Sequence, residues 1–122
     1  MRACGRQNAS VLVDTLHFHS SRAPIGELAI LPADRVQYVH VCDGPGDVPA
    51  APDDLRRIAR AERLMPGEGG IDLAGMLGCL PRDIVYAVEI QNPERSRALG
   101  AEPYARLAFE TTARCLQRLP AR

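Results

Sequence analysis

Lysine is absent from this sequence, and no stretch of it gathers positive charge. Fifteen arginines balance fifteen aspartates and glutamates, so the formal net charge is zero. A surface that binds nucleic acid needs an excess of positive charge, because contacts to the phosphate backbone dominate the affinity. The composition therefore argues against nucleic acid as a partner.

Closely spaced cysteine pairs are also missing. The four cysteines lie far apart in the sequence, and none forms a CxxC pair. Zinc ribbons and thiol redox motifs both need close pairs, so neither is supported. We expect the cysteines to be free, buried thiols of a protein in the reducing cytosol. They are Cys4, Cys42, Cys79 and Cys115.

Long hydrophobic runs are the third absence. No run approaches the roughly 20 apolar residues that a membrane-spanning helix needs. Residues 1–8 contain no apolar segment of the kind found in signal peptides. We therefore expect a cytoplasmic protein without a membrane partner. Its 122 residues, 46% of them hydrophobic, suit one domain over 1–122.

Short apolar runs alternate with segments of helical spacing. The runs predicted as strands are 10–14, 36–42 and 84–90. The segments predicted as helices are 25–31, 54–63, 73–80 and 103–119, while 17–23 is interpreted as a loop. Strands that alternate with helices need crossover connections, which make the sheet parallel. The fold class is therefore α/β, with about three parallel strands.

Each predicted strand carries one ionisable side chain at or near its C-terminal end, namely Asp14, His40 and Glu89. In parallel α/β folds this end of the sheet binds ligands. A carboxylate in an apolar strand is costly to bury unless a cation or hydrogen bonds satisfy it. A shared divalent cation explains all three residues, and two oxygens with one nitrogen suit Mn²⁺, Zn²⁺, Co²⁺ or Mg²⁺ alike. In the alternative interpretation the carboxylates cap helices or pair with arginine, and the histidine is structural.

Four motifs in order resemble those of the xylose-isomerase-like TIM barrels, which include sugar epimerases, inosose-processing enzymes and endonuclease IV. Residues 14–17 read DTLH, similar to the family's D-T-x-H. Residues 39–43 read VHVCD, similar to V-H-x-x-D, and 66–72 read PGEGGID, similar to P-G-x-G-x-I-D. The last motif is AVEI at 87–90, which resembles the family's final strand with its glutamate.

The resemblance implies a role for each site residue. Asp14, His40 and Glu89 would be metal ligands, and Glu89 would also move a proton next to a metal-polarised carbonyl or hydroxyl. His17 would contact substrate oxygens, unless it is a structural histidine in its loop. Arg63 would hold a substrate hydroxyl or phosphate, or else lie at a solvated helix end. Asp43 would either orient His40 or cap its own turn.

Two departures from the family pattern limit the resemblance. A complete barrel needs eight β/α units and about 250 residues, so the chain is similar only to the C-terminal part of one. We expect the family's first metal ligand, a glutamate on an earlier strand, and half of the substrate pocket to lie outside this chain. Endonuclease IV also has a D-x-H pair before its glycine loop, whereas residues 60–65 here read RAERLM.

The function implied by the resemblance is metal-dependent isomerisation or epimerisation of a sugar, sugar acid or polyol ketone. The alternative is a truncated or split barrel fragment that is inactive alone and acts as an assembly module. A relative of the metal-dependent endonucleases is the least favoured interpretation. The expected partners are a small carbohydrate and either a second copy or a complementing barrel half, because a partial barrel leaves open strand edges. The inner barrel face is expected to carry Val11, Val13, Val39, Val85 and Ala87, or their alternates.

Overall fold

The protein, described here by a computed structural model, folds around a small parallel sheet. The structure describes residues 5–120. In chain order the elements are β1 (Val11–Asp14), α1 (Thr15–Ser20), α2 (Gly26–Ala29), the 3₁₀ turn η2 (Ala33–Arg35), β2 (Val36–Val41), α3 (Pro52–Ala61), α4 (Leu73–Cys79), β3 (Val85–Val88), α5 (Pro93–Leu99) and α6 (Ala101–Gln117). The sheet order is β1-β2-β3, and both strand pairs are parallel. The predicted α/β class and the parallel sheet are confirmed.

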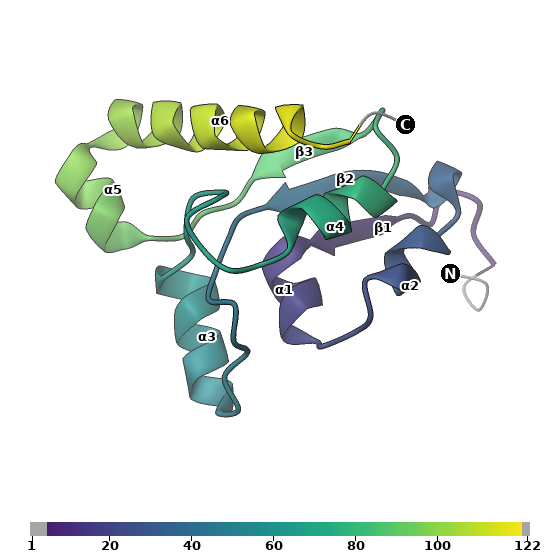
Figure 1. The fold of residues 1–122 in the computed structure, drawn as a ribbon, viewed down its shortest axis with the longest axis horizontal. Coiled ribbons are helices and arrows are strands. Elements are labelled where there is room, and N and C mark those ends of the chain that lie inside the picture. Colours follow the sequence, from purple (N-terminus) through teal and green to yellow (C-terminus); the bar gives the residue numbers. More distant parts are fainter. Residues whose placement is uncertain (1–4, 121–122) are drawn as a thin grey trace.

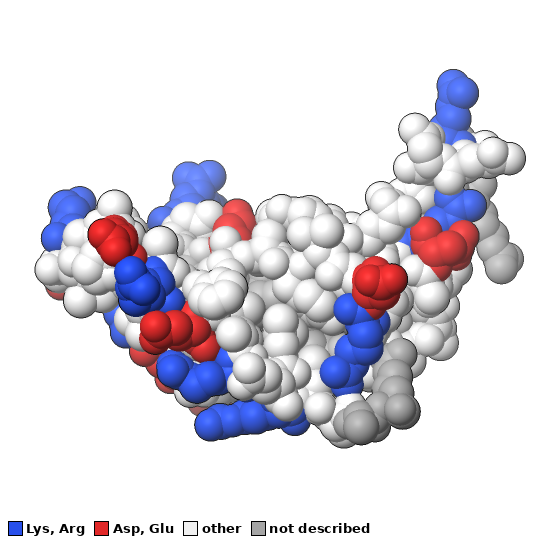
Figure 2. Space-filling model, turned by 90° about the horizontal axis from the view of Figure 1, so that it is seen from above, with Lys and Arg blue, Asp and Glu red and all other residues white. Residues whose placement is uncertain are grey.

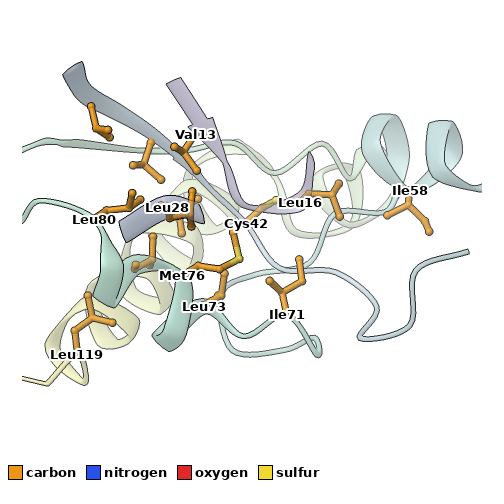
Figure 3. Close-up of a cluster of buried hydrophobic side chains, with 14 residues drawn as sticks. Val13, Leu16, Leu28, Cys42, Ile58, Ile71, Leu73, Met76, Leu80 and Leu119 are labelled. Carbon is orange, nitrogen blue, oxygen red and sulfur yellow. The ribbon is translucent and has the colours of Figure 1, made fainter. Parts of the chain in front are cut away.

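Helices α2, α4 and α6 cover one face of the sheet (Figure 1). Val13, Val39 and Val41 point into this face and are buried beneath them. From the helices, Leu28 of α2 and Leu77 of α4 complete the core, part of which Figure 3 shows. Alternate residues of a strand point to opposite faces, so this packing decides which strand residues remain on the other side.

The opposite face of the sheet is open within residues 5–120. Register pairs Leu12 with Tyr38 and Tyr38 with Val85, so the three side chains share this face. Leu12 is 50% exposed and Val85 is 56% exposed. In a closed barrel this would be the interior.

The structure selects between the two alternate sets of strand residues that were expected on the inner face. Of the valines assigned to it, Val13 and Val39 pack under the helices instead. Val85 does lie on the open face, beside Leu12 and Tyr38. The strand runs are apolar at nearly every position, so the sequence does not show which alternate set faces the helices.

Two short helices were not predicted. Helix α1 begins at Thr15 and runs into the segment 17–23 that was interpreted as a loop. The Asp14 carboxylate caps it by accepting the N–H groups of Leu16 and His17. Helix α5 begins after Asn92, whose side chain accepts the N–H of Arg95. Both are too short to show a clear helical period in the sequence.

Among residues 5–120 the cysteines are free, with Cys42 buried and Cys79 and Cys115 partly buried. Cys4 lies outside the described residues. No helix in this part of the chain has the length and apolar character needed to cross a membrane. The face seen in Figure 2 is largely uncharged over its middle, and charged side chains of both signs gather toward its edges.

Candidate metal centre

Asp14, His40 and Glu89 lie together on the open face, at the C-terminal ends of the strands. Register pairs Asp14 with His40 and His40 with Ala87, which places Glu89 just beyond the end of β3. The Glu89 N–H continues the ladder by donating to the Val41 carbonyl at 3.1 Å. One candidate ligand atom from each of the three lies within 4.8 Å of the others. The structure thus brings together the side chains that the sequence singled out.

His40 lies between the two carboxylates. Its Nδ1 is 2.7 Å from Glu89 Oε2 and 3.8 Å from Asp14 Oδ2. The Tyr38 ring packs edge-on against the imidazole, with 5.3 Å between the ring centroids. To bind a cation, His40 would present Nδ1 without a proton, because a ligating imidazole nitrogen must be unprotonated.

The two oxygens of the Asp14 carboxylate have different partners, one in helix α1 and one in the metal centre. Oδ1 accepts the N–H groups of Leu16 and His17 at 2.9 and 3.1 Å, whereas Oδ2 faces His40. Burial raises the pKa of the Asp14 carboxyl, but the His17 N–H and Arg63 outweigh burial, so this pKa lies below its usual value. The carboxylate is therefore both a helix cap and an available ligand.

Arg63 supplies a positive charge to the cluster. Its guanidinium Nη1 lies 2.9 Å from Asp14 Oδ2 and 3.5 Å from Glu89 Oε2. The residue is 3% exposed, and its Nε donates to the Ala59 carbonyl at 3.0 Å. The expectation of a solvated helix end is therefore wrong. The two carboxylate oxygens that face His40 are the same atoms that Arg63 neutralises.

A buried thiol completes this corner. Cys42 Sγ lies 3.3 Å from Arg63 Nη1, and its backbone N–H donates to Thr15 Oγ1 at 3.1 Å. Burial raises the pKa of the Cys42 thiol, and the attraction of Arg63 only partly opposes this. Cys42 is thus a neutral neighbour of the cluster.

Asp43 organises the glycine-rich loop. Its carboxylate is buried, with the residue 1% exposed. Oδ1 accepts the N–H groups of Gly44 and Ile71 at 2.8 and 3.1 Å, and Oδ2 accepts those of Gly67 and Gly69 at 2.9 and 3.0 Å. Of its two expected roles, the structure shows the one that holds the turn. This corrects the expectation that Asp43 orients the histidine of the metal centre.

His17 and Arg63, the expected substrate contacts, both line a hollow next to the cluster. His17 is exposed on α1, and its Nε2 lies 3.5 Å from Arg63 Nη2. The sequence analysis missed Gln91, whose Nε2 donates to Glu89 Oε1 at 2.9 Å. Gln91 comes two residues after Glu89, a spacing that places side chains on the same face of an extended strand. This spacing is the signal by which the sequence could have identified Gln91.

The donor set fits a divalent cation. Two carboxylate oxygens and one imidazole nitrogen lie close together on a face that is open to a ligand. Such mixed oxygen and nitrogen sets suit Mn²⁺, Zn²⁺, Co²⁺ or Mg²⁺. The cation would insert between His40 and Glu89, which lie 2.7 Å apart, and would share Asp14 and Glu89 with Arg63. Asp14, His40 and Glu89 are therefore the residues that would hold the cation.

The chain is similar to inosose isomerases. It is 30% identical over 115 residues to the inosose isomerase of Bacillus velezensis, which covers 92% of this chain and 39% of the relative. It is 29% identical over 115 residues to that of Halalkalibacterium halodurans, covering 92% of this chain and 38% of the relative. The chain thus spans about two-fifths of the length of these relatives. No family model matches it.

Solved structures agree with these sequence matches. An IolI protein with a bound zinc atom superposes with a TM-score of 0.78 and 26% identity, over 99% of this chain and 42% of that one. A xylose isomerase domain protein from Alicyclobacillus acidocaldarius superposes with a TM-score of 0.68 and 26% identity, over 95% of this chain and 40% of that one. The chain therefore has the xylose-isomerase-like TIM-barrel fold that its motifs indicate, and it spans part of such a barrel.

Proposed function

We propose that this chain carries three ligands of a divalent-metal centre in a sugar isomerase or epimerase. The observation that carries the proposal is the convergence of Asp14, His40 and Glu89 at the C-terminal ends of three parallel strands. The inosose isomerase relatives and the zinc atom in the IolI structure support it. We place the chain in the C-terminal part of the barrel, with a further glutamate ligand supplied from outside residues 1–122.

The side chains suit proton transfer next to a carbonyl. When bound, a divalent cation polarises substrate oxygens and acidifies the adjacent C–H. Glu89 is partly exposed and its Oε2 lies on the open face, 2.7 Å from His40 Nδ1, so a substrate there can give its proton to this carboxylate. Gln91 holds the other oxygen, Oε1, at 2.9 Å and so fixes the carboxylate plane. Glu89 is therefore the proposed base, and Arg63 and His17 face the substrate.

Metal binding is the first test. Titration calorimetry with Mn²⁺ should show weak binding to the chain, because it offers three ligands and an open position. His40→Ala removes the nitrogen ligand and should weaken Mn²⁺ binding by at least about ten-fold, since even second-shell changes cost this much. His19→Ala, which deletes an imidazole outside the cluster, is the matched control and should bind like the unaltered chain.

The same proteins separate catalysis from assembly. With Mn²⁺ and an inosose in D₂O, an active chain should catalyse deuterium uptake next to the carbonyl, as followed by NMR, and His40→Ala should lose it. An assembly module should bind Mn²⁺ without catalysing deuterium uptake. Equal Mn²⁺ affinity in the unaltered chain and His40→Ala would reject the metal centre itself.

The open apolar face supports a second candidate role, as a module that completes a barrel with another chain. Leu12, Tyr38 and Val85 expose a contiguous strip on this face. Exposed apolar patches and unpaired strand edges favour association. We propose that the chain pairs with a second copy or with a complementing barrel half through this face.

Self-association is therefore expected for the isolated chain. Sedimentation velocity at micromolar concentration should show dimers or larger species, and Val85→Arg should shift the chain toward monomer by placing a charge on the open face. Ile30→Arg is the control, because Ile30 is 80% exposed but lies outside the strands. A sharp monomer for the unaltered chain would contradict this role, as would equal shifts for both variants.

A further inference from the structure

A hollow of about 610 Å³ lies beside the metal centre, between α1 and α3. Figure 1 shows these helices next to each other at one end of the sheet. The polar residues that line this hollow are His17, Ser20, Arg56, Arg60, Arg63 and Gln91. The volume is within the range of small-molecule sites.

The charges around this hollow are of one sign. Three arginines line it, and no carboxylate does. Arg56 and Arg60 are four residues apart on α3 and so project from the same side of the helix. Arg57 lies off this side and is instead paired with Asp54 and Glu62. Arg56 and Arg60 therefore present their guanidinium groups on the side of α3 that lines the hollow.

The lining arginines differ in how far they are already neutralised. Arg63 pairs with the Asp14 and Glu89 carboxylates, and Arg56 pairs with the exposed Asp53 at 3.0 Å. The Arg60 guanidinium makes no hydrogen bond or ion pair with any residue in the part of the chain that the structure describes. Arg60 therefore has all of its donors available for an anion.

The hollow and the metal centre share two side chains. Arg63 contacts Asp14 through Nη1. Its Nη2 lies 3.5 Å from Nε2 of His17, and both residues line the hollow. Gln91 lines the hollow and also donates to Glu89. A ligand in the hollow can therefore contact two side chains that also hold the carboxylates of the metal centre. Leu16 and Leu55 provide an apolar surface for its carbon chain.

We infer that the hollow binds the anionic end of a small polyhydroxylated substrate, a carboxylate or a phosphate, with Arg60 as its main contact. This inference rests on the proposed function and, among the substrates that function allows, favours sugar acids and sugar phosphates over uncharged compounds. The anion lies among Arg60, Arg56 and His17, and the remaining oxygens face the metal centre. An uncharged sugar or polyol leaves Arg60 without a partner and binds more weakly.

Calorimetry on the full chain, with metal removed by a chelating resin, tests this inference. Gluconate provides a carboxylate, glucose 6-phosphate provides a phosphate, and glucitol is the uncharged polyol. At least one anion should bind about five-fold or more tightly than glucitol, and raising the salt concentration should reduce the difference. Preference for gluconate identifies a carboxylate site, and preference for glucose 6-phosphate identifies a phosphate site. Equal binding of all three compounds overturns the inference.

Two variants assign the effect to Arg60. Arg60→Gln should lose about five-fold in affinity for the preferred anion while its affinity for glucitol is unchanged. Arg97→Gln removes the same charge from an exposed position on α5, outside the hollow, and should bind like the unaltered chain. Equal losses in both variants would show non-specific attraction and overturn the inference. Since no metal is present, failure of the Mn²⁺ titration leaves this result standing, and the reverse also holds.

Discussion

Asp43→Ala should lower the free energy of unfolding by about 4 kcal/mol or more, because hydrogen bonds to a buried charged group contribute roughly 1.5–3 kcal/mol each. The Asp43 carboxylate accepts four backbone N–H groups, and the substitution leaves these donors without it. A domain of this size has a total stability of about 5–15 kcal/mol. Urea denaturation followed by circular dichroism should therefore find the variant close to unfolded at room temperature.

Asp72→Ala is the matched control for this substitution. The Asp72 side chain is exposed and accepts one backbone N–H, from Gly75 at 2.8 Å, at the start of α4. Loss of such a helix cap costs about 1 kcal/mol. Similar losses in the two variants would contradict the role assigned to Asp43 in holding the glycine-rich loop. Asp43→Asn should fall between them, because the amide keeps one acceptor oxygen.

The role of Asp43 shows where the sequence stops being informative. A carboxylate after a strand and before a glycine suggests a local turn, and the bond to Gly44 is of that kind. Its bonds to Gly67, Gly69 and Ile71 join it to a loop far along the chain. Which N–H groups reach one carboxylate depends on how the strand and the loop pack. Spacing along the sequence does not encode this.

The metal centre could be predicted because it depends on strand ends alone. Apolar runs placed the strands, and parallel order then brought Asp14, His40 and Glu89 to one rim. The position of Arg63 could not be predicted in this way. It follows α3, and only the packing of that helix against α1 carries its guanidinium to the carboxylates. Long side chains can reach several places, so their partners are fixed by tertiary structure.

The sequence also did not show which side chains of each strand point toward the helices. Val13 and Val39 resemble Leu12 and Val85 in hydrophobicity, yet the first two are buried under helices and the last two are exposed. In a barrel both faces are apolar, one packed on helices and one turned inward. An alternating polar pattern, which marks a half-solvated sheet, is therefore missing from these strands.

Arg63→Met should destabilise the metal-free chain by about 3 kcal/mol, the usual result of removing one partner from a buried ion pair. Arg63 Nη1 lies 2.9 Å from Asp14 Oδ2 and 3.5 Å from Glu89 Oε2, so the substitution leaves these two carboxylates without their cation. The side chain of methionine is of similar length and fills much of the space. The loss of stability should therefore come mainly from the missing positive charge and less from changed packing. Urea denaturation at pH 7 measures this loss.

The same variant should bind Mn²⁺ about ten-fold more tightly, which corresponds to relief of roughly 1.4 kcal/mol of repulsion between the guanidinium and the metal ion. Saturating Mn²⁺ should then return part of the lost stability, because a ligand that binds only the folded state stabilises it. Arg57→Met is the control, since Arg57 is exposed on α3 and pairs with Asp54 and Glu62. It should be nearly as stable as the unaltered chain, because exposed ion pairs contribute little, and it should bind Mn²⁺ unchanged. Weaker Mn²⁺ binding by Arg63→Met would show that the guanidinium holds the carboxylates in place for the metal instead of competing with it.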